Sequence, residues 1–325
     1  MPPTSAHFQL EDEHTMREAK TLVDSPYIHA VQLKHFITFD VFPMVAVASL
    51  PLYWKYLETG CFEAALGVAF WLITGIGITV GYHRLFTHRS FQCARPLQAL
   101  LGATAAMAGQ GGVISWVAIH RYHHENSDKP GDLHSPNLHG SGLINSLRGL
   151  LHSHFVWMAR HSYPNVARYV PDLLRDGMLS TINRYYYHWI ALGLIIPTLL
   201  GGLYHQSLKG ALSGLVWGGI IRIFVVEHII WAVNSLGHAV GSRPYNTREN
   251  SRNLGLLAIV TLGECWHNNH HRFTTSPNFG LRWYKLDPGY WFIKSMELCG
   301  LAWDLKVPGS HDIALRGRLG TPFHH

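Results

Sequence analysis

The chain has 325 residues, of which 47% are hydrophobic, and its mean hydropathy is +0.05. These values predict a membrane protein with a large polar part and exclude a bundle that is wholly buried in lipid. The formal net charge of +6 suits a protein face that meets anionic membrane lipid, and no run of Lys or Arg indicates a nucleic-acid partner.

The chain begins with a polar, partly acidic stretch, 1–38, which lacks the features of a signal peptide and is expected to be a cytoplasmic lead-in. Four hydrophobic segments follow, each near the length that crosses the hydrocarbon core of a bilayer. They are 41–57, 62–82, 186–203 and 212–233. Short connections within each pair predict two helical hairpins. We therefore expect an all-α integral membrane protein with four transmembrane helices, a single domain over 1–325 and a C-terminal tail at 307–325.

The region between the hairpins, 83–185, contains ten Lys and Arg but only five Asp and Glu. An excess of basic residues marks cytoplasmic segments, so we expect this region, both termini and the active site on the cytoplasmic side. Within it, 94–119 is moderately apolar, but a fifth span there would separate His88 from His120 across the membrane. We interpret 94–119 as one or two helices at the interface or against the bundle, in a cytoplasmic helical cap.

Histidines recur in four short motifs. These are HRLFTH at 83–88, HRYHH at 120–124, NSLGH at 234–238 and HNNHH at 267–271. Positions i, i+3 and i+4 share one face of a helix, and imidazole suits Zn, Cu, Fe and Ni. Nine histidines are too many for one tetrahedral site, so the motifs predict a site that holds two metal ions. The alternatives are a histidine-rich surface and ordinary core histidines.

Two spacings set conditions on this site. His83 and His88 are five residues apart and diverge by about 140° on a straight α-helix, so they can share a site only if the helix ends between them. Asn234 precedes His238 by four residues and shares its face, so its amide could hold a metal-bound water. The alternative for Asn234 is a capping or buried amide.

Carboxylates near the motifs are candidates to orient the imidazoles. Asp128, Asp132 and Glu264 lie close in sequence, and metal-binding histidines normally donate their second ring nitrogen to such acceptors. The alternative is that they are solvated loop charges. Arg222 and Glu227 lie inside the fourth hydrophobic segment on different faces, where a structural role and a functional role are equally compatible with the sequence.

A site built from imidazoles at a membrane surface favours redox chemistry on a hydrophobic substrate. Hydrolytic two-metal sites usually use bridging carboxylates, and the motifs contain only Glu264. No Ser-His-Asp pattern, P-loop or dinucleotide motif is present, so we expect the electrons to come from a separate protein.

The motifs resemble those of the membrane-bound acyl desaturases of the stearoyl-CoA, or Δ9, type, in order and spacing. The similarity covers roughly 40–306 and includes GECWHNNHH at 263–271. The resemblance implies a di-iron centre that uses O2 and two electrons to remove two hydrogens from a saturated acyl chain and leave a cis double bond. It implies iron ligation by His83, His88, His120, His123, His124, His238, His267, His270 and His271, with Asn234 acting through water.

The resemblance also implies a bent acyl tunnel. It places Gln110, Trp116 and Trp231 at the bend, and Trp157 is a further candidate for the tunnel wall. Trp71 and Gly75, one helical turn apart, match the closed end, so we hypothesise that Trp71 limits the chain length. The alternative for these residues is simple packing. Ile230 stands where animal members have threonine.

The remaining partners follow from the same resemblance. The donor would be an external ferredoxin or cytochrome b5, and the acyl chain could be carried on coenzyme A, acyl carrier protein or a glycerolipid. Two other functions stay open from the residues themselves. One is a histidine-box hydroxylase of alkyl or lipid substrates, and the other is a non-enzymatic metal-binding membrane protein.

Overall fold

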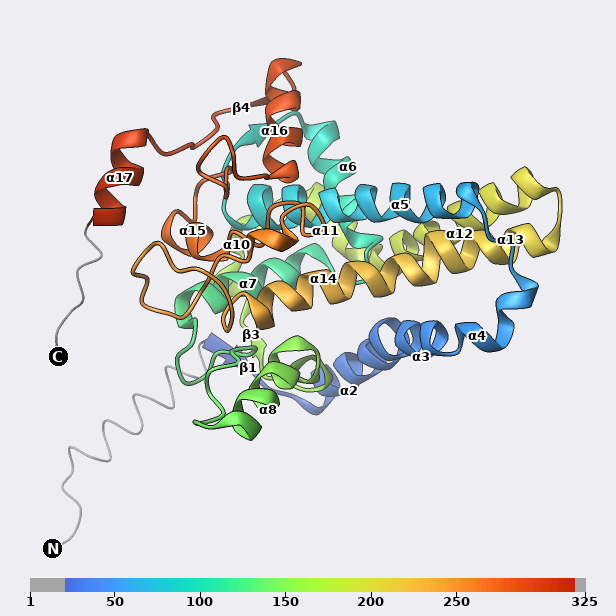
Figure 1. Cartoon of the computed structure of the whole chain (residues 1–325), viewed down its shortest axis with the longest axis horizontal. Coiled ribbons are helices and arrows are strands. Elements are labelled where there is room, and N and C mark those ends of the chain that lie inside the picture. Colours follow the sequence, from blue (N-terminus) through green and yellow to red (C-terminus); the bar gives the residue numbers. More distant parts are fainter. Residues whose placement is uncertain (1–20, 319–325) are drawn as a thin grey trace, which may run out of the picture.

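The computed structural model describes residues 21–318 and is built almost entirely from helices (Figure 1). Residues 1–20 and 319–325 lie outside the described residues. The first part of the expected lead-in and the end of the expected tail fall in these two stretches.

Four helical stretches are long and apolar enough to cross a membrane. They are Pro26–Ala48 (α2 Pro26–His35, η1 Phe36–Val41 and α3 Phe42–Ala48), Cys61–Thr87 (α5 Cys61–Ile76 and η3 Gly77–Thr87), Tyr186–His205 (α12) and Leu208–Leu236 (α13 Leu208–Gly214, η5 Leu215–Ile221 and α14 Arg222–Leu236). The segments η1, η3 and η5 are π-helical. The expected all-α architecture with four spans is confirmed.

The first span differs from its predicted bounds, because it covers Pro26–Ala48 rather than 41–57. Only the short helices α4 (Leu50–Tyr53) and η2 (Trp54–Tyr56) follow it, and the expected lead-in 1–38 is correspondingly too long. Polar residues had lowered the hydropathy here, but the fold buries them. The Gln32 amide donates to the carbonyl of His161 at 3.1 Å, and Asp40 is 3% exposed.

Small residues let the spans approach closely. A Cβ added to Gly77 would lie 2.3 Å from the backbone nitrogen of Ala105, so η3 contacts the next helix backbone to backbone. A Cβ on Gly201 would lie 2.3 Å from the carbonyl oxygen of Gly210, which holds α12 against α13 in the second hairpin.

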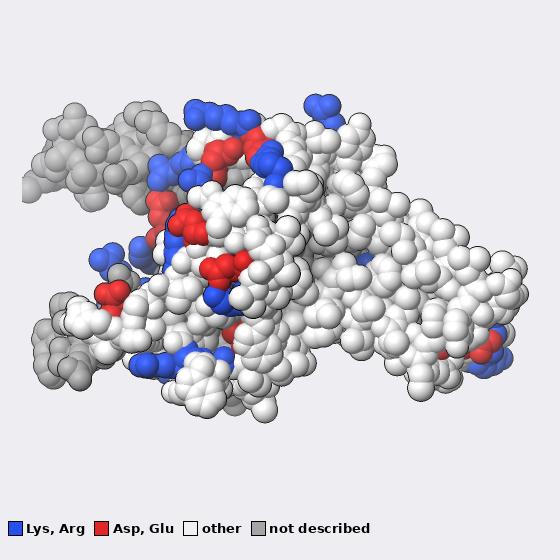
Figure 2. Space-filling model, turned by 90° about the horizontal axis from the view of Figure 1, so that it is seen from above, with Lys and Arg blue, Asp and Glu red and all other residues white. Residues whose placement is uncertain are grey.

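Charge separates the molecule into two parts (Figure 2). Lys, Arg, Asp and Glu gather at one end, over the non-spanning elements, and the bundle beside them is almost free of charge on the face shown. A few charges reappear at the far tip. Lys209, in the first turn of α13, lies 3.3 Å from Glu58. An uncharged bundle between two charged ends fits a membrane-spanning part.

Apart from α4 and η2, the elements outside the spans form a cap at one end of the bundle (Figure 1). Its helices are α6 (Arg95–Ala106), α7 (Val113–Asn126), α8 (Leu143–His154), η4 (Val156–Ala159), α9 (Val166–Tyr169), α10 (Pro171–Leu174), α11 (Gly177–Arg184), η6 (Gly255–Leu257), α15 (His267–Arg272), α16 (Pro288–Leu298) and α17 (Ser310–Arg318). The stretch 94–119 is thus divided between α6 and the start of α7, as expected, and neither helix is a candidate span.

Two antiparallel strand pairs tie distant parts of the chain to this cap. Strand β1 (Leu22–Val23) pairs with β3 (Tyr163–Pro164), and β2 (Gln92–Cys93) pairs with β4 (Ala302–Trp303). The second pair holds the segment that follows the first histidine motif against the C-terminal part of the chain.

Candidate metal centre

A π-helical turn brings the first two histidines together. The backbone nitrogen of His88 donates to the carbonyl of His83 at 3.2 Å, which is the i→i+5 bond that defines this helix type. Residues five apart then lie one turn apart, and the two ring centroids are 4.9 Å from each other. The helix ends at Thr87, between His83 and His88 as expected, and the π-helical turn before this end is the feature that the sequence did not predict.

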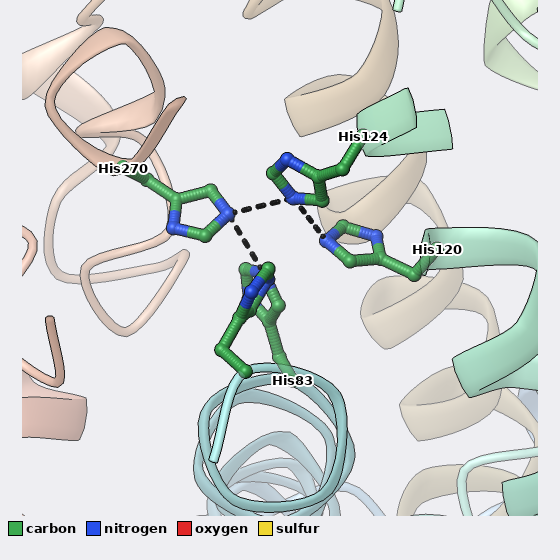
Figure 3. Close-up of side chains that lie close together, drawn as sticks. His83, His120, His124 and His270 are labelled. Atoms are coloured by element: carbon green, nitrogen blue, oxygen red, sulfur yellow. Dashed lines mark hydrogen bonds between the residues drawn. The ribbon is translucent and has the colours of Figure 1, made fainter. Parts of the chain in front are cut away.

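Five histidines form the first group, which we call the five-histidine group. One ring nitrogen from each lies within 4.8 Å of one from every other member: His83, His88, His120, His124 and His270. Figure 3 shows four of these rings converging from three separate helical segments, η3, α7 and α15. The Nε2 atom of His124 lies 3.0 Å from Nε2 of His120 and 3.0 Å from Nε2 of His270.

The other four predicted histidines form a second cluster, the four-histidine group, which consists of His123, His238, His267 and His271. The Nε2 atoms of His238 and His267 are 2.9 Å apart. Helices α7 and α15 each contribute to both groups, because i, i+3 and i+4 positions direct neighbouring imidazoles to two adjacent points. All nine predicted histidines are thus arranged around two points.

Carboxylates contact the outward ring nitrogens, as predicted for Glu264, Asp132 and Asp128. Glu264 Oε2 lies 2.5 Å from His83 Nδ1. Asp132 Oδ1 lies 3.1 Å from His123 Nδ1, and Asp128 Oδ2 lies 3.1 Å from His238 Nδ1. These contacts fix the ring orientation and leave the Nε2 atoms facing inward.

Sequence reasoning missed a fourth carboxylate of this kind. Glu249 Oε1 lies 3.6 Å from Nδ1 of His271, and the Glu249 side chain is buried. It lies in the loop after α14, and no spacing in that loop marks it as a partner of a histidine far along the chain. Its position becomes visible only when the loop folds back over α15.

The inward nitrogens have the arrangement that metal ions require. Two nitrogens that each lie about 2.1 Å from one ion are roughly 3 Å apart, which matches the short Nε2–Nε2 separations in both groups. The Nε2 atoms of His88 and His271 are buried and have no hydrogen-bond partner in the described part of the chain. Buried imidazoles in such numbers would be costly without a ligand, so the residues fit two metal ions.

The protonation state of the buried histidines also favours metal binding. Burial, together with the neighbouring imidazoles, lowers the pKa of His120, His124 and His270 well below the ordinary value. The pKa of His267 and His271 is lowered well below the ordinary value for the same reasons. Neutral imidazole is the form that binds a metal. Burial would raise the pKa of Asp132, but the adjacent His123 lowers it, so the carboxylate stays ionised and accepts from the ring.

An apolar cavity of about 400 Å³ reaches the histidines. Four predicted tunnel residues line it, namely Gln110, Trp116, Trp157 and Trp231, and so does Asn234. Trp116 stacks on His120 with ring centroids 5.1 Å apart, which places an aromatic wall directly beside the five-histidine group. This volume is within the range of small-molecule sites.

The predicted closed end is not part of this cavity. Trp71 and Gly75 instead line a separate pocket of about 10 Å³, and Ile230 lines both spaces. The resemblance implied one tunnel along all these residues, and Ile230 is the residue that the two spaces share.

Comparison with known proteins agrees with this geometry. A family model described as fatty acid desaturase matches residues 63–297. The chain is 45% identical to hex-5-enoyl-[acyl-carrier protein] acetylenase of Moorena producens over 295 aligned residues. The alignment covers 90% of this chain and 91% of that protein. It is 37% identical to sn-1 stearoyl-lipid 9-desaturase of Anabaena variabilis, in an alignment that covers 75% of this chain and 85% of that protein. It is 34% identical to acyl-CoA C20 Delta5-desaturase of Anemone leveillei, in an alignment that covers 74% of this chain and 72% of that protein.

Proposed function

The chain belongs to the fatty acid desaturase family and is an oxidoreductase that acts on acyl chains, and we propose that it inserts a cis double bond at Δ9 of a saturated chain. Two C–H bonds break on neighbouring carbons and a C=C bond forms. O2 accepts these two hydrogens, two further electrons and two protons, and leaves as two water molecules. The observation that carries this proposal is the convergence of nine histidines around two points at the wall of an apolar cavity.

The proposed ions are two irons, one in each histidine group. Iron is implied by the family resemblance, since imidazole ligands alone suit several metals. When bound, the ions supply activation of O2 and the oxidising power that removes hydrogen from the acyl chain. The amide of Asn234, which lines the cavity as His267 does, would hold a water for the ion in the four-histidine group.

The side chains of the cavity orient the substrate. Val31 and Tyr187 line the cavity and are 42% and 53% exposed, so the cavity opens to the surface near them. We assign Trp116, Trp231 and Gln110 to holding the reacting carbons against the histidines, from which bulk water is excluded by the buried aromatic walls.

The exposed end of the cavity also carries a cation, Arg184, which suits an anionic acyl carrier. The names of the relatives include acyl-carrier protein, lipid and coenzyme A substrates, so all three carriers are candidates. An external ferredoxin or cytochrome b5 would supply the electrons. The excess of basic residues in 83–185 supports a cytoplasmic position for the cap, the active site and both termini.

A second reaction has a specific observation in its favour. The relative from Moorena producens is named for an acetylenase that acts on an alkenoyl group. The same balance applied to an existing double bond would break two vinylic C–H bonds and form a triple bond, with O2 again leaving as two waters. A hydroxylase, in contrast, would leave one oxygen atom on the product.

The deciding experiment expresses the full chain in cells that lack their own desaturase. We expect a new double bond, located by mass spectrometry in the acyl-carrier, coenzyme A or glycerolipid pool, and about two irons per chain in the purified protein. Feeding an alkenoyl substrate tests for a triple bond. His120→Ala should remove the product, whereas His188→Ala, at an exposed residue outside both groups, should retain it. A hydroxylated product, or no oxidised product, would overturn the proposal.

A further inference from the structure

Three ionisable side chains line the cavity beside the metal centre but belong to neither histidine group. His35 and Asp40 lie on the first span, and Tyr186 begins α12. They line the same cavity as His83 and His120 of the five-histidine group. The proposed function gives these three residues no role. Because a single space connects them to the histidines, a proton that leaves them can reach the place where O2 is reduced.

Close contacts connect the three side chains into a chain. The hydroxyl of Tyr186 accepts a hydrogen bond from the backbone N–H of Gly111 at 2.7 Å and lies 2.9 Å from His35 Nε2. His35 Nδ1 in turn lies 3.7 Å from Asp40 Oδ2. Asp40 follows His35 by five residues in the π-helical segment η1, so it lies one turn deeper in the bundle. The chain therefore leads from a hydroxyl at the cavity wall to a carboxyl that is 3% exposed.

Glu227 of the fourth span continues this chain. Its carboxyl group faces that of Asp40, and its Oε1 lies 3.8 Å from the position that a Cβ on Gly109 would occupy, in the turn that contains Gly111. Glu227 is 0% exposed, and neither of its oxygens has a hydrogen-bond partner among the described residues. Arg222 is close enough to attract it, but all three guanidinium nitrogens of Arg222 donate to backbone carbonyls. The protein itself therefore leaves this carboxyl pair without a donor.

Two carboxyl groups that face each other in a low-dielectric interior cannot both stay ionised, so the pair holds at least one proton. The oxidation of an acyl chain consumes two protons from outside for each O2 that leaves as water. An acyl chain that enters beside Val31 and Tyr187 fills the mouth of the cavity and keeps bulk water out. These protons therefore need a source inside the protein at the moment of reaction.

We propose that Asp40 and Glu227 store a proton, which His35 and Tyr186 deliver to the cavity for the reduction of O2. This inference rests on the proposed function and assigns the source of the protons that it consumes. In each delivery, Asp40 gives its proton to Nδ1 of His35, the Nε2 proton of His35 passes to the Tyr186 oxygen, and the hydroxyl proton passes to water in the cavity. One proton moves and no electron does, and Asp40 regains a proton from solvent through the partly exposed ring of His35.

The test supplies membranes that contain the full-length protein with reduced ferredoxin or cytochrome b5 and a saturated acyl substrate. Asp40→Asn and Glu227→Gln keep the size of each side chain but remove the acidic proton. We expect kcat for olefin formation to fall roughly tenfold or more, with KM within about twofold and an unchanged iron content. Because proton delivery then limits the rate, kcat should become sensitive to D2O and insensitive to deuterium on the acyl chain. Glu227→Asp retains a carboxyl group and should recover most of the rate.

A buried carboxyl outside the cavity supplies the matched control. Glu63 also lies in a span, is 2% exposed and contacts His205 Nε2 at 2.6 Å, but it does not line the cavity. Glu63→Gln should leave kcat and both isotope effects unchanged. Tyr186→Phe removes only the hydroxyl through which the proton leaves, so it should shift the isotope effects as Glu227→Gln does, and it decides the question if a carboxyl variant fails to fold.

The isotope effects separate proton delivery from a structural role. A fall in kcat without a change in either isotope effect would mean that the carboxyl pair only shapes the cavity, and it would overturn the inference while the proposed function stands. Unchanged kcat in both Glu227→Gln and Tyr186→Phe would do the same. If the unmodified protein formed no oxidised product, the proposed function itself would fail, and the relay with it.

Discussion

A buried arginine of the membrane bundle and the buried histidines of the cap are satisfied in opposite ways. In the membrane bundle, each of the three guanidinium nitrogens of Arg222 donates to a backbone carbonyl, those of Met107, Gly193 and Gly218. At the cap, the Nε2 atoms of the histidines face one another, and those of His88 and His271 have no hydrogen-bond partner among the described residues. The protein itself completes the first environment, whereas the second requires a ligand.

This contrast assigns different roles to residues that a sequence presents alike. A buried group with a full set of protein partners stabilises the fold, and its loss should lower stability whether or not metal is bound. A buried group that faces unpartnered nitrogens should affect stability only through the metal, since a bound ion stabilises the folded state by mass action. Variants at the two kinds of position distinguish these two cases.

The largest effect is expected for a histidine at the centre of the five-histidine group. His124→Ala removes the ring that contacts both His120 and His270, so we expect at least a hundredfold loss of product formation and about one iron per chain instead of about two. After chelation, its unfolding temperature should equal that of chelated unmodified protein. His188→Ala serves as the control. Two irons retained in His124→Ala would contradict the assignment of that ring as a ligand.

A smaller effect is expected when an orienting carboxylate is changed. Glu264→Gln keeps the size of the side chain but loses the charge that holds His83 Nδ1, so activity or iron affinity should fall by about ten- to a hundredfold. Glu249→Gln is the comparison, because Glu249 lies 3.6 Å from His271 Nδ1 and should matter less. Iron content and olefin yield measure both. Equal losses in the two variants would mean that the distance between carboxylate and imidazole does not determine how much the carboxylate contributes to iron binding and activity.

The opposite pattern is expected for Arg222. Arg222→Met leaves three buried carbonyls without a donor and should cost about 3 kcal/mol, which corresponds to a fall in Tm of roughly 5–10 °C. The fall should be the same in metal-loaded and in chelated protein. Lys209→Met, at an exposed ion pair in α13, should change Tm little. If chelation abolished the difference, Arg222 would act through the metal centre, and the contrast would fail.

The sequence predicted the histidine clusters of the cap better than its backbone. Motif spacing was enough to identify all nine histidines and three of the four orienting carboxylates, because i, i+3 and i+4 positions converge on any regular helix. It could not identify Glu249, whose partner is distant in the chain. It also could not show that η3 is π-helical, since the choice between i→i+4 and i→i+5 bonds depends on packing against α6.

The error at the first span has a physical cause. Hydropathy counts Gln32 and Asp40 as unfavourable in a membrane, although both face the protein interior and are buried there. The outcome depends on which way a side chain points, and periodicity alone does not determine this for a helix with several packed faces.

The smallest effect concerns a partly exposed ionic contact that supports the second histidine motif. Asp172, in α10, accepts hydrogen bonds from Arg121 at 2.7 and 3.0 Å and from Arg89. Burial would raise the pKa of Asp172, but these two guanidinium groups lower it to about 2 from the ordinary 3.8. The carboxylate is 25% exposed, so screening reduces its contribution to stability to about 1–2 kcal/mol.

The sign of the pH dependence follows from that lowered pKa. Near pH 3 the unfolded chain binds more protons at Asp172 than the folded chain does, so the stabilisation is complete above about pH 4 and is lost as the pH falls through about 2. Thermal unfolding of Asp172→Asn should therefore differ from that of the unmodified protein at neutral pH and converge with it in acid. Glu125→Gln, at an exposed pair with Arg168, should show little difference at either pH. A difference for Asp172→Asn that is independent of pH would mean that packing, and not charge, links α10 to the histidine helix.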